Sequence, residues 1–364
     1  MRVLYFTAKD SPHDRRFLSA LAKTEHQVFS LRMHPCQPET IPGITELTWP
    51  EGGPDWSCWL GWLGGKTQFS SILNELKPDL VHAGPVQGPA FLASLAGFHP
   101  LVTMSWGSDL LRSSTRSPWM DFATRCTLGK SDLLLVDCQT VAEEAASYGF
   151  SLERMVRFPW GVDLAHFSPA NAAGPGLALK KSLGWEDKFV LFCNRTWSKP
   201  YGVTVLAEAF AAASQKWADL RLLLAGDGLQ SEQVRRILAP VGDAVHFPGW
   251  VESEDLPRFY GAGDLFVSPS HSDGSSISLL EALACGRPAL VSDIPSNREW
   301  VIPGETGDWF VDGDVASLEN KLLSLASDPN LHTYGDHARV VAEARADWNV
   351  NFQKLLFAYE LAVR

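Results

Sequence analysis

One segment in the second half of the chain combines residue types that could bind a phosphorylated or hydroxyl-rich ligand. It reads Ser-His-Ser-Asp-Gly-Ser-Ser-Ile-Ser-Leu-Leu-Glu from Ser270 to Glu281 and follows an apolar run that ends near Pro269. A small turn followed by a helix from about Ser276 leaves backbone N–H groups at the positive helix end, which suits an anion or sugar oxygens. Asp273 and Glu281 could then reach different parts of one ligand. Taken alone, the same turn is also what a simple helix cap requires.

Two cations lie in a second segment with a similar setting. The sequence Asn-Arg-Thr-Trp-Ser-Lys-Pro-Tyr-Gly ends at Gly202 and begins where the apolar run Phe189–Asn194 finishes. Arg195 and Lys199 are therefore predicted in a loop after a strand, where fixed positive charge could neutralise a departing phosphate. The alternative is that both cations are simply solvated there, and that Glu281 is a surface carboxylate.

Short apolar runs that alternate with helical patterns would form the scaffold for these segments. Such runs are typical of buried parallel strands separated by helices. In the first half of the chain the predicted strands are Val3–Thr7, Val28–Leu31, Asp79–His82, Leu101–Ser105 and Leu133–Val136. In the second half they are Phe189–Asn194, Arg221–Ala225, Val245–Phe247, Leu265–Pro269 and Ala289–Ser292.

This alternation predicts an α/β fold with two Rossmann-like domains, each a doubly wound parallel sheet. Ligands bind beyond the carboxyl ends of the strands in such sheets, so we expect the main site in a central cleft between the two domains. The segment Asn171–Gly176, Asn-Ala-Ala-Gly-Pro-Gly, is small and poor in packing groups, which favours a linker. The predicted domains are therefore residues 1–168 and 178–345.

Composition excludes several classes of protein. The chain has 364 residues, of which 45% are hydrophobic and 20% charged, so it is not disordered and suits about two globular domains. A net charge of -11 without a long basic run argues against nucleic-acid binding. Six scattered cysteines without a Cys-x-x-Cys pair indicate reduced thiols and no zinc site. Without a signal peptide or a run of about 18 apolar residues, a cytoplasmic location is expected.

A tryptophan-rich segment, residues 49–65, stands apart from the alternating pattern. Trp56, Trp59 and Trp62 are spaced so that a short helix could place three indoles on one side. One interpretation is a packed insertion. The other is an interfacial patch or a platform for an amphiphilic acceptor, which would hold the protein peripherally at the inner face of a membrane.

The segment Ser270–Pro288 resembles the E-x7-E signature of retaining glycosyltransferase family 4, group 1, whose members have the GT-B fold. The segment from Arg195 to Gly202 resembles the family's Arg…Lys-Gly diphosphate clamp. Four further stretches resemble the family at corresponding places, namely Leu222–Gly228, Phe247–Val251, Val291–Trp300 and Gly304–Gly307. The resemblance covers the carboxyl half nearly end to end and the amino half more loosely.

The resemblance implies an enzyme that moves a sugar with retention from a UDP- or GDP-linked donor to a hydroxyl acceptor, in glycan, glycolipid or polysaccharide synthesis. It implies no metal and no cofactor beyond the nucleotide sugar. Arg195, Lys199 and Asp273 would be catalytic, at the diphosphate and the donor sugar. Glu281 would hold the ribose hydroxyls, and the other donor-binding residues would be Gly274, Ser275, Ser276, Ile277, Trp250 and Val251. The final helix, residues 346–364, would cross back onto the amino-terminal domain.

In the amino half, Pro78–Gly88 resembles the family's D-x-V-H segment facing the acceptor, and residues 102–109 resemble its H-G-x-D strand end. The resemblance makes His82 and Asp109 candidates for orienting the acceptor hydroxyl, with Gly84 and Gln87 beside the acceptor. The alternatives are a core histidine for His82 and a helix N-cap for Asp109.

The loop after the first predicted strand is polar and charged, where family members usually carry glycines. His13 and Arg16 in this loop are therefore candidates for binding an anionic or hydroxyl-rich acceptor. The alternative is that Ser11 and Asp14 cap a helix and the arginines are solvated.

Two positions depart from the family pattern. Asp273 stands where the family has Glu, and it is one methylene shorter. Trp106 stands where His is commoner, and an indole cannot accept a proton. These departures leave a catalytically silent sugar-nucleotide-binding or partner subunit as the alternative function. A sugar-nucleotide epimerase is disfavoured by the family signature, and a nicotinamide dehydrogenase because no G-x-G-x-x-G opens a helix.

Overall fold

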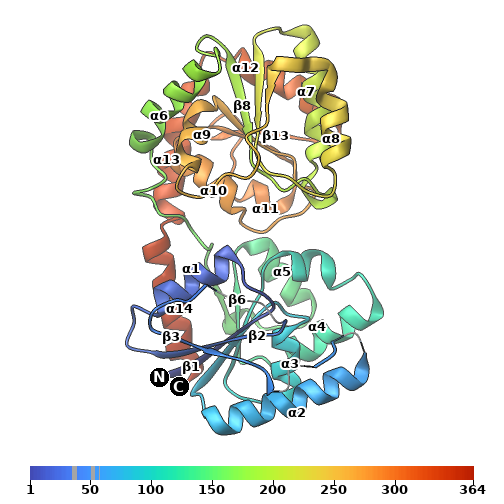
Figure 1. The fold of residues 1–364 in the computed structure, drawn as a ribbon, viewed down its shortest axis with the longest axis vertical. Coiled ribbons are helices and arrows are strands. Elements are labelled where there is room, and N and C mark those ends of the chain that lie inside the picture. The colour runs from blue at the N-terminus through green and yellow to red at the C-terminus, as the bar shows by residue number, and fades with distance from the viewer. Residues whose placement is uncertain (35–38, 51–53, 57) are drawn as a thin grey trace. The chain divides into compact units, whose positions relative to one another are not determined.

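The computed structural model describes residues 1–34, 39–50, 54–56 and 58–364, which form two compact units. The first unit comprises Met1–Phe158 and Phe352–Arg364, and the second comprises Pro159–Asn351. Each unit is built on one parallel sheet flanked by helices (Figure 1). The α/β fold class with two Rossmann-like units is therefore confirmed.

The first unit contains a seven-stranded sheet in the order β3-β2-β1-β4-β5-β6-β7, and its recorded strand pairings are all parallel. Its strands are β1 (Arg2–Thr7), β2 (Gln27–Arg32), β3 (Ile44–Leu47), β4 (Leu80–Ala83), β5 (Leu101–Met104), β6 (Leu133–Val136) and β7 (Met155–Arg157). The helices are α1 (Pro12–Leu21), α2 (Trp59–Leu76), α3 (Pro89–Ala96), α4 (Pro118–Lys130) and α5 (Gln139–Ser147), with short turns η2 (Asp109–Ser113) and η3 (Leu152–Arg154).

Alternate residues of β1 point into different cores of the first unit. Leu4 and Phe6 lie in a cluster that includes Phe69 of α2. Tyr5, between them, stands edge-on to the ring of His82 on β4, with ring centroids 4.7 Å apart. A strand that is buried on both faces needs this uninterrupted apolar sequence, which is why the run Val3–Thr7 shows no polar alternation.

The second unit contains a six-stranded parallel sheet in the order β10-β9-β8-β11-β12-β13. Its strands are β8 (Phe189–Cys193), β9 (Leu220–Leu224), β10 (Val245–His246), β11 (Leu265–Ser268), β12 (Ala289–Ser292) and β13 (Gly307–Phe310). The helices are α6 (Pro169–Ser182), α7 (Val203–Lys216), α8 (Ser231–Leu238), α9 (Leu256–Ala262), α10 (Ile277–Ala284), α11 (Pro295–Arg298), α12 (Val315–Ala326) and α13 (Leu331–Arg345), with short turns η4 (Lys199–Tyr201) and η5 (Ala239–Ala244).

The segment expected to be a linker is instead part of helix α6, so that prediction is wrong. Ser168 caps the helix through its hydroxyl, and Pro169 occupies the first turn, where a missing N–H costs little. The small residues serve close packing against α9. A Cβ on Gly176 would lie 2.2 Å from the carbonyl carbon of Gly261, and one on Gly261 would lie 1.9 Å from the oxygen of Ala172. Small side chains therefore mark a tight helix contact here and not a flexible joint.

The last helix, α14 (Trp348–Ala362), begins in the second unit and ends in the first. Its Tyr359 is fully buried, and the tyrosine hydroxyl lies 2.6 Å from Nδ1 of His82 on β4. The final helix thus returns to the amino-terminal unit, as the family resemblance implies.

Candidate active site

In the second unit, the loop after β8 packs against the turn after the neighbouring strand β11. The backbone N–H of His271 donates to the carbonyl oxygen of Pro200 at 2.9 Å. Gly202 has a φ of +58°, and a Cβ there would lie 2.0 Å from the oxygen of Pro269, so only glycine fits this approach. Because β8 and β11 are paired, their carboxyl ends place both predicted ligand-binding segments at one edge of the sheet.

Arg195 is the side chain that joins these two segments. Its guanidinium donates to the hydroxyls of Ser276 and Ser278, each at 2.7 Å, and forms an ion pair with Asp273. The guanidinium carbon also lies 4.4 Å from the centre of the Tyr201 ring. The arginine is therefore held in one orientation at the start of helix α10, where the helix dipole already favours an anion.

The surroundings of Asp273 act on the pKa of its carboxyl group in opposite directions. Burial raises the pKa of its carboxyl group, while the charge of Arg195 and the N–H of Gly274, at 3.1 Å, act in the opposite direction. Asp273 has a shorter side chain than the glutamate of the family pattern. In this structure that side chain forms an ion pair with Arg195.

Glu281 lies on α10 and is nearly buried, with a relative exposure of 7%. The hydroxyl of Tyr260, from α9, donates to its Oε2 at 2.7 Å, and the side-chain amide of Asn194 donates to that hydroxyl at 3.0 Å. Burial, followed by the charge of Glu281, raises the pKa of Tyr260 well above its usual value, so the tyrosine remains a donor. Asn194 directly precedes Arg195 in the sequence. The hydrogen bonds from Asn194 to Tyr260 and from Tyr260 to Glu281 therefore connect Glu281 to the loop that carries Arg195.

Sequence reasoning missed Tyr260 as a member of this site. Its only sequence signal is an aromatic residue among apolar neighbours in a helix, which core packing explains equally well. Ser278 was likewise overlooked as a partner of Arg195, although it lies one helical position from Ile277.

The turn that precedes α10 is built from buried small residues. Gly274, Ser275 and Ser276 are all buried, and the Ser275 hydroxyl accepts from the indole N–H of Trp300 at 3.1 Å. Ser276 precedes the first helical residue, Ile277, but its side chain makes no capping bond to the helix because it faces Arg195. The first amides of α10 therefore have no side-chain cap from that residue.

The remaining donor-site candidates lie on the surface or in the core. Lys199 is exposed in η4, adjacent to the Pro200 carbonyl that pairs with the β11 turn. Trp250 is 70% exposed and follows Gly249, whose carbonyl accepts from the N–H of Gly226 at the end of β9. Val251 packs against the core of the second unit. The structure brings Arg195, Asp273, the α10 turn and Glu281 together, and it leaves Lys199 and Trp250 on adjoining loops.

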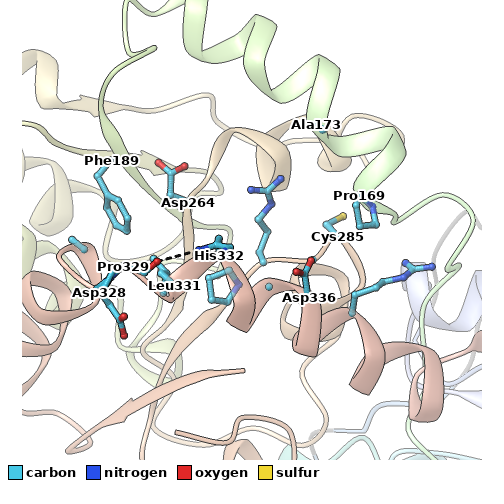
Figure 2. Close-up of a pocket in the computed structure, with 16 residues that line it drawn as sticks. Pro169, Ala173, Phe189, Asp264, Cys285, Asp328, Pro329, Leu331, His332 and Asp336 are labelled. Atoms are coloured by element: carbon cyan, nitrogen blue, oxygen red, sulfur yellow. Dashed lines mark hydrogen bonds between the residues drawn. The ribbon is translucent and has the colours of Figure 1, made fainter. Parts of the chain in front are cut away.

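A cavity of about 590 Å³ lies elsewhere in the second unit, where the strands begin (Figure 2). It is lined by Phe189 at the start of β8, Asp264 just before β11 and Pro288 just before β12. These residues mark the amino ends of the strands, whereas Arg195 follows the carboxyl end of β8. This cavity is therefore separate from the candidate donor site.

In the first unit, a cavity of about 480 Å³ lies at the carboxyl ends of β1, β2, β4 and β5, and we call it the tryptophan pocket. Its lining comes from the loops that follow these strands and from the α2 and α4 regions. The lining residues are Ala8, Met33, His34, Trp56, Trp62, Pro85, Gln87, Gly88, Pro89, Trp106, Ser108, Asp109, Ser113 and Met120.

Asp109 is buried in the wall of this pocket and is surrounded by donors. Its carboxylate accepts from the Ser105 hydroxyl at 2.7 Å and from the backbone N–H groups of Val86, Trp106 and Leu110 at 2.9, 3.0 and 3.0 Å. Burial raises its pKa and these hydrogen bonds oppose the rise. Asp109 thus connects the loops after β4 and β5. The alternative interpretation gave it only the role of a helix N-cap.

Gln87 and Gly84 belong to the loop after β4. The Gln87 amide donates to the carbonyl of Asp109 at 2.7 Å and to the Thr124 hydroxyl at 2.8 Å. Gly84 is buried, and a Cβ there would lie 2.4 Å from the oxygen of Met104. Gln87 therefore lines the pocket, whereas Gly84 serves the close approach of β4 and β5.

His82 is not at the pocket, and its proposed contact with an acceptor is wrong. It is 1% exposed and lies between Tyr5 and Tyr359 in the core. Burial lowers its pKa to about 3, so the imidazole is neutral at neutral pH. The family-like motif therefore ends in a core histidine, bonded to a tyrosine from the far end of the sequence.

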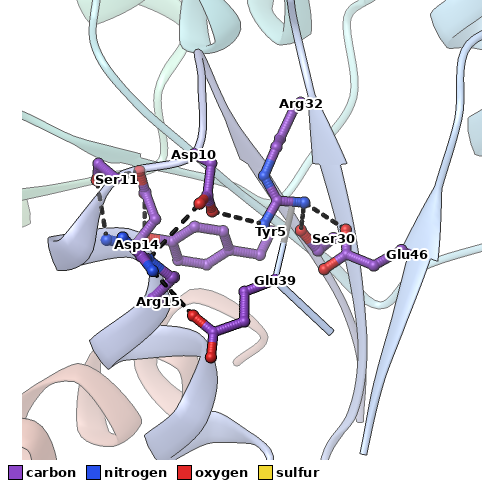
Figure 3. Close-up of polar contacts among 9 residues, drawn as sticks. All are labelled: Tyr5, Asp10, Ser11, Asp14, Arg15, Ser30, Arg32, Glu39 and Glu46. Atoms are coloured by element: carbon purple, nitrogen blue, oxygen red, sulfur yellow. Dashed lines mark hydrogen bonds and ion pairs between the residues drawn. The ribbon is translucent and has the colours of Figure 1, made fainter. Parts of the chain in front are cut away.

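The polar loop after β1 forms the start of α1. Ser11 caps the helix by accepting from the N–H of Asp14 at 3.1 Å, and Asp14 accepts from the buried hydroxyl of Tyr5 at 2.9 Å (Figure 3). Nearby, Arg32 pairs with Asp10 and Glu46. Ser11 thus caps the helix as the alternative expects, whereas Asp14 is a buried acceptor inside α1 and Arg15 is ion-paired with Asp10 and Glu39.

The two acceptor candidates of this loop lie differently. His13 is exposed, and its ring centroid is 5.8 Å from that of Trp106, so it adjoins the tryptophan pocket. Arg16 is half-buried on α1 and is not among the residues that line the pocket.

The tryptophans of residues 49–65 do not form one surface stripe. Trp62 is only 9% exposed, and its ring stands edge-on to that of Trp56 at 5.3 Å. The indole N–H of Trp56 donates to the carbonyl of Met33 at 2.9 Å. The packed-insertion interpretation holds for these two residues, and a membrane-facing Trp62 is wrong because it is buried. The side chain of Trp59 lies outside the described part of the structure.

Some features are absent from the described residues. None of the described helices is both long and apolar enough to cross a membrane. No group of three His, Cys, Asp or Glu side chains in the described ranges is arranged to hold a metal ion. Five cysteines are free thiols, and Cys36 lies outside the described residues.

Comparisons with known proteins match each half of the chain to a family. Residues 187–328 match the family described as Glycosyl transferases group 1, and residues 2–138 match the family described as Glycosyl transferase 4-like. The two matches support a group 1 glycosyltransferase.

Two curated relatives illustrate the level of similarity. The chain is 30% identical over 206 residues to a GDP-mannose-dependent monoacylated alpha-(1-6)-phosphatidylinositol monomannoside mannosyltransferase of Corynebacterium glutamicum, with 54% of each chain covered. It is 26% identical over 313 residues to Sulfoquinovosyl transferase SQD2 of Arabidopsis thaliana, covering 78% of this chain and 57% of the relative. The chain thus spans little more than half the length of these relatives.

Solved structures share the fold over nearly the whole chain. Anabaena Alr3699/HepE in complex with UDP has a TM-score of 0.81 at 20% identity, with 99% of this chain and 100% of that chain covered. WaaG, a glycosyltransferase involved in lipopolysaccharide biosynthesis, has a TM-score of 0.75 at 17% identity, with 98% of each chain covered. These likenesses show the GT-B fold, which contains two Rossmann-like parallel-sheet domains.

Proposed function

We propose that this protein is a glycosyltransferase that transfers a sugar from a nucleoside-diphosphate donor to a hydroxyl acceptor. The observation that carries the proposal is the placement of Arg195, the first turn of α10 and Glu281 at one edge of the second sheet. A cation, the first amides of a helix and a buried carboxylate are the groups that a diphosphate and a ribose require. The family matches of both halves support the same function.

In the proposed reaction, the bond between the anomeric carbon of the sugar and the donor phosphate oxygen breaks. A bond forms between that carbon and the acceptor oxygen, and the acceptor proton passes to the phosphate oxygen. The departing nucleoside diphosphate gains negative charge, which Arg195 and Lys199 stabilise. Retention of the anomeric configuration follows the family resemblance. Since the two cations supply positive charge at the diphosphate, we propose no resident metal or cofactor.

Glu281 has the proposed role of binding the ribose hydroxyls. A carboxylate accepts two hydrogen bonds from neighbouring hydroxyls, and its position must be fixed for both to form. The Tyr260 hydroxyl, donating at 2.7 Å, supplies this fixation from the core side. Gly274 to Ile277 would bind phosphate and sugar oxygens through the backbone, and Trp250 and Val251 would lie near the base.

The identity of the nucleotide is the open choice within this proposal. The C. glutamicum relative is named as GDP-mannose-dependent, and the Anabaena structure contains UDP. We therefore propose a UDP- or GDP-sugar as the donor. We propose glycan or glycolipid assembly as the setting, with a hydroxyl group of such a molecule as the acceptor.

Calorimetric titration of the full chain with UDP and GDP tests the proposal. We expect one of them to bind with micromolar-scale affinity and Glu281→Ala to weaken that binding roughly tenfold or more. Glu343→Ala, on the exposed side of α13, is the matched control and should bind like wild type. Failure of both nucleotides to bind would refute the proposal.

A second measurement separates transfer from silent binding. Release of UDP or GDP from the matching sugar nucleotide should accelerate when a hydroxyl acceptor is added. Nucleotide binding without any such release, even by slow donor hydrolysis, would instead identify a catalytically silent subunit.

A further inference from the structure

The tryptophan pocket carries an inference about the acceptor, and this inference rests on the proposed function. The pocket lies within the first unit, and its volume of about 480 Å³ falls in the range of small-molecule sites. The chemistry of its walls indicates what part of an acceptor it can hold.

Three indoles form much of the lining, and the structure holds them in place. Trp56 is fixed by its hydrogen bond to the carbonyl of Met33, and Trp62 packs edge-on to both Trp56 and Phe91. Trp106 comes from a different element, the loop after β5, and its ring also lies 6.4 Å from that of Phe17. Fixed aromatic faces offer a large contact area at little cost in side-chain entropy.

The described residues of the pocket lining present almost no charge to a ligand. Of the described residues that line it, the ionisable ones are Asp109 and His34, and neither Lys nor Arg is among them. The Asp109 carboxylate already accepts four hydrogen bonds from the protein. Burial, followed by the charge of Lys9, lowers the pKa of His34, which favours its neutral form. An anionic ligand group would therefore find neither Lys nor Arg among the lining residues that the structure describes.

The pocket nevertheless contains groups that form hydrogen bonds. The Gln87 side-chain nitrogen is committed to Asp109 and Thr124, which leaves its amide oxygen to accept a hydrogen bond. The side chains of Ser108 and Ser113 add two hydroxyls to the lining. A purely apolar chain in this space would bury such groups without hydrogen-bond partners, which is unfavourable.

We propose that the tryptophan pocket binds a neutral saccharide unit of the acceptor. The C–H faces of the sugar ring would contact the indoles of Trp56 and Trp106, with the buried Trp62 packed behind Trp56, and its hydroxyls would bond to Gln87 and the serines. Trp106, which replaces the histidine of the family pattern, thereby becomes a specificity determinant. It favours an uncharged ring over sugars that carry a carboxylate or phosphate.

The proposal is tested by saturation-transfer NMR on the full chain, with and without saturating UDP or GDP. The probes are the methyl α-glycosides of glucose, mannose and galactose as neutral sugars, glucuronic acid as an anion, and octanol as an apolar chain. We expect the strongest transfer to the ring C–H protons of a neutral glycoside. Trp106→Ala should reduce this transfer at least fivefold, whereas Trp106→Phe should retain most of it.

The matched control is Phe357→Ala, which removes an aromatic ring 53% exposed on α14 of the first unit that does not line the pocket. It should give the same transfer as wild type, and thermal unfolding of each variant checks that it is folded. A stronger response to glucuronic acid or octanol, or none to any neutral glycoside, would overturn the proposal. An equal loss in Trp106→Ala and Phe357→Ala would also overturn it.

Calorimetry with UDP and GDP on the same samples separates the two proposals. Trp106→Ala should bind the nucleotide like wild type, because Trp106 belongs to the first unit and the donor-site residues to the second. If the nucleotide binds and no neutral glycoside does, the pocket proposal fails alone. If neither nucleotide binds to wild type, the proposed function fails, whatever the sugars do.

Discussion

Arg195 and Asp273 form an ion pair at the carboxyl edge of the second sheet, and both side chains are mostly shielded from water. The arginine that we propose to meet the donor diphosphate therefore already has an anionic partner. A phosphate group must compete with Asp273 for the guanidinium, or share it through its remaining N–H donors.

Removing the competing charge should strengthen nucleotide binding. We expect Asp273→Asn to lower the Kd for UDP or GDP by roughly threefold to tenfold, since the cation is released and a repulsive carboxylate is lost. Titration calorimetry at low ionic strength measures the change. The control is Asp293→Asn, whose carboxylate pairs with Arg298 on the surface of the same unit, and its Kd should stay at the wild-type value. A weaker affinity in Asp273→Asn would mean that the carboxylate positions Arg195 and does not compete.

The Tyr260 hydroxyl should contribute to nucleotide binding without touching the nucleotide. Tyr260→Phe keeps the ring in the core but removes the donor to Glu281, so the carboxylate loses its fixed orientation. We expect a Kd roughly threefold to tenfold higher, which corresponds to a hydrogen bond worth about 0.5–1.5 kcal/mol. Tyr334→Phe, which removes a hydroxyl bonded to Asp328, is the control. Equal affinities for Tyr260→Phe and wild type would show that Glu281 needs no support.

His82 should make the stability of the protein depend on pH. Its pKa is about 3 in the folded protein and about 6.5 when unfolded, so the unfolded chain binds more protons between these values. This contribution is fully present above pH 6.5 and falls as the pH drops, by at most about 1.4 kcal/mol per unit. Urea unfolding of wild type and His82→Gln from pH 7.5 to 4.5 should show a difference in free energy that shrinks with acid.

A direct measurement of His82 avoids any dependence on the folding of that variant. Its imidazole C–H resonances should stay at their neutral positions down to pH 5 in the wild-type protein. A midpoint near 6.5 would contradict the buried, neutral histidine described here.

Two glycines in the same helix should respond to alanine in opposite ways. Gly176→Ala places a methyl group against the Gly261 backbone, and we expect a loss of about 1–3 kcal/mol in the free energy of unfolding. Gly174→Ala meets nothing within 4 Å and should gain about 0.5–1 kcal/mol from the better helix propensity of alanine. Urea titrations of both variants measure these changes. Similar behaviour of the two would mean that α6 and α9 do not pack closely.

The sequence predicted the structure correctly where a pattern of residues has one main physical explanation. Continuous apolar runs such as Val3–Thr7 and Leu133–Val136 have few explanations besides buried strands, and they predicted the two sheets. The linker prediction at Asn171–Gly176 failed because small residues suit both flexible chain and tight helix packing. Only the position of Gly261, far along the chain, decides between these readings.

The residues of the candidate site that lie in distinctive sequence segments were predicted, and those whose role depends on distant contacts were not. Arg195, Asp273 and Glu281 share segments with glycines and hydroxyl residues, and the structure brings these segments together. Tyr260 gave no polar signal, because its hydroxyl matters only once Glu281 is beside it. His82 looked reactive in its motif, yet its surroundings depend on Tyr359, a contact that local sequence cannot reveal.

The contact between His82 and Tyr359 also has a consequence for biosynthesis. The two residues are 277 positions apart, so a ribosome adding roughly 5–20 residues per second needs on the order of tens of seconds to make the second after the first. During that interval the nascent amino-terminal sheet lacks the helix that covers His82. A translating chain must therefore hold an incomplete first unit, with an uncovered apolar face exposed to chaperones, until synthesis has passed through the whole second unit.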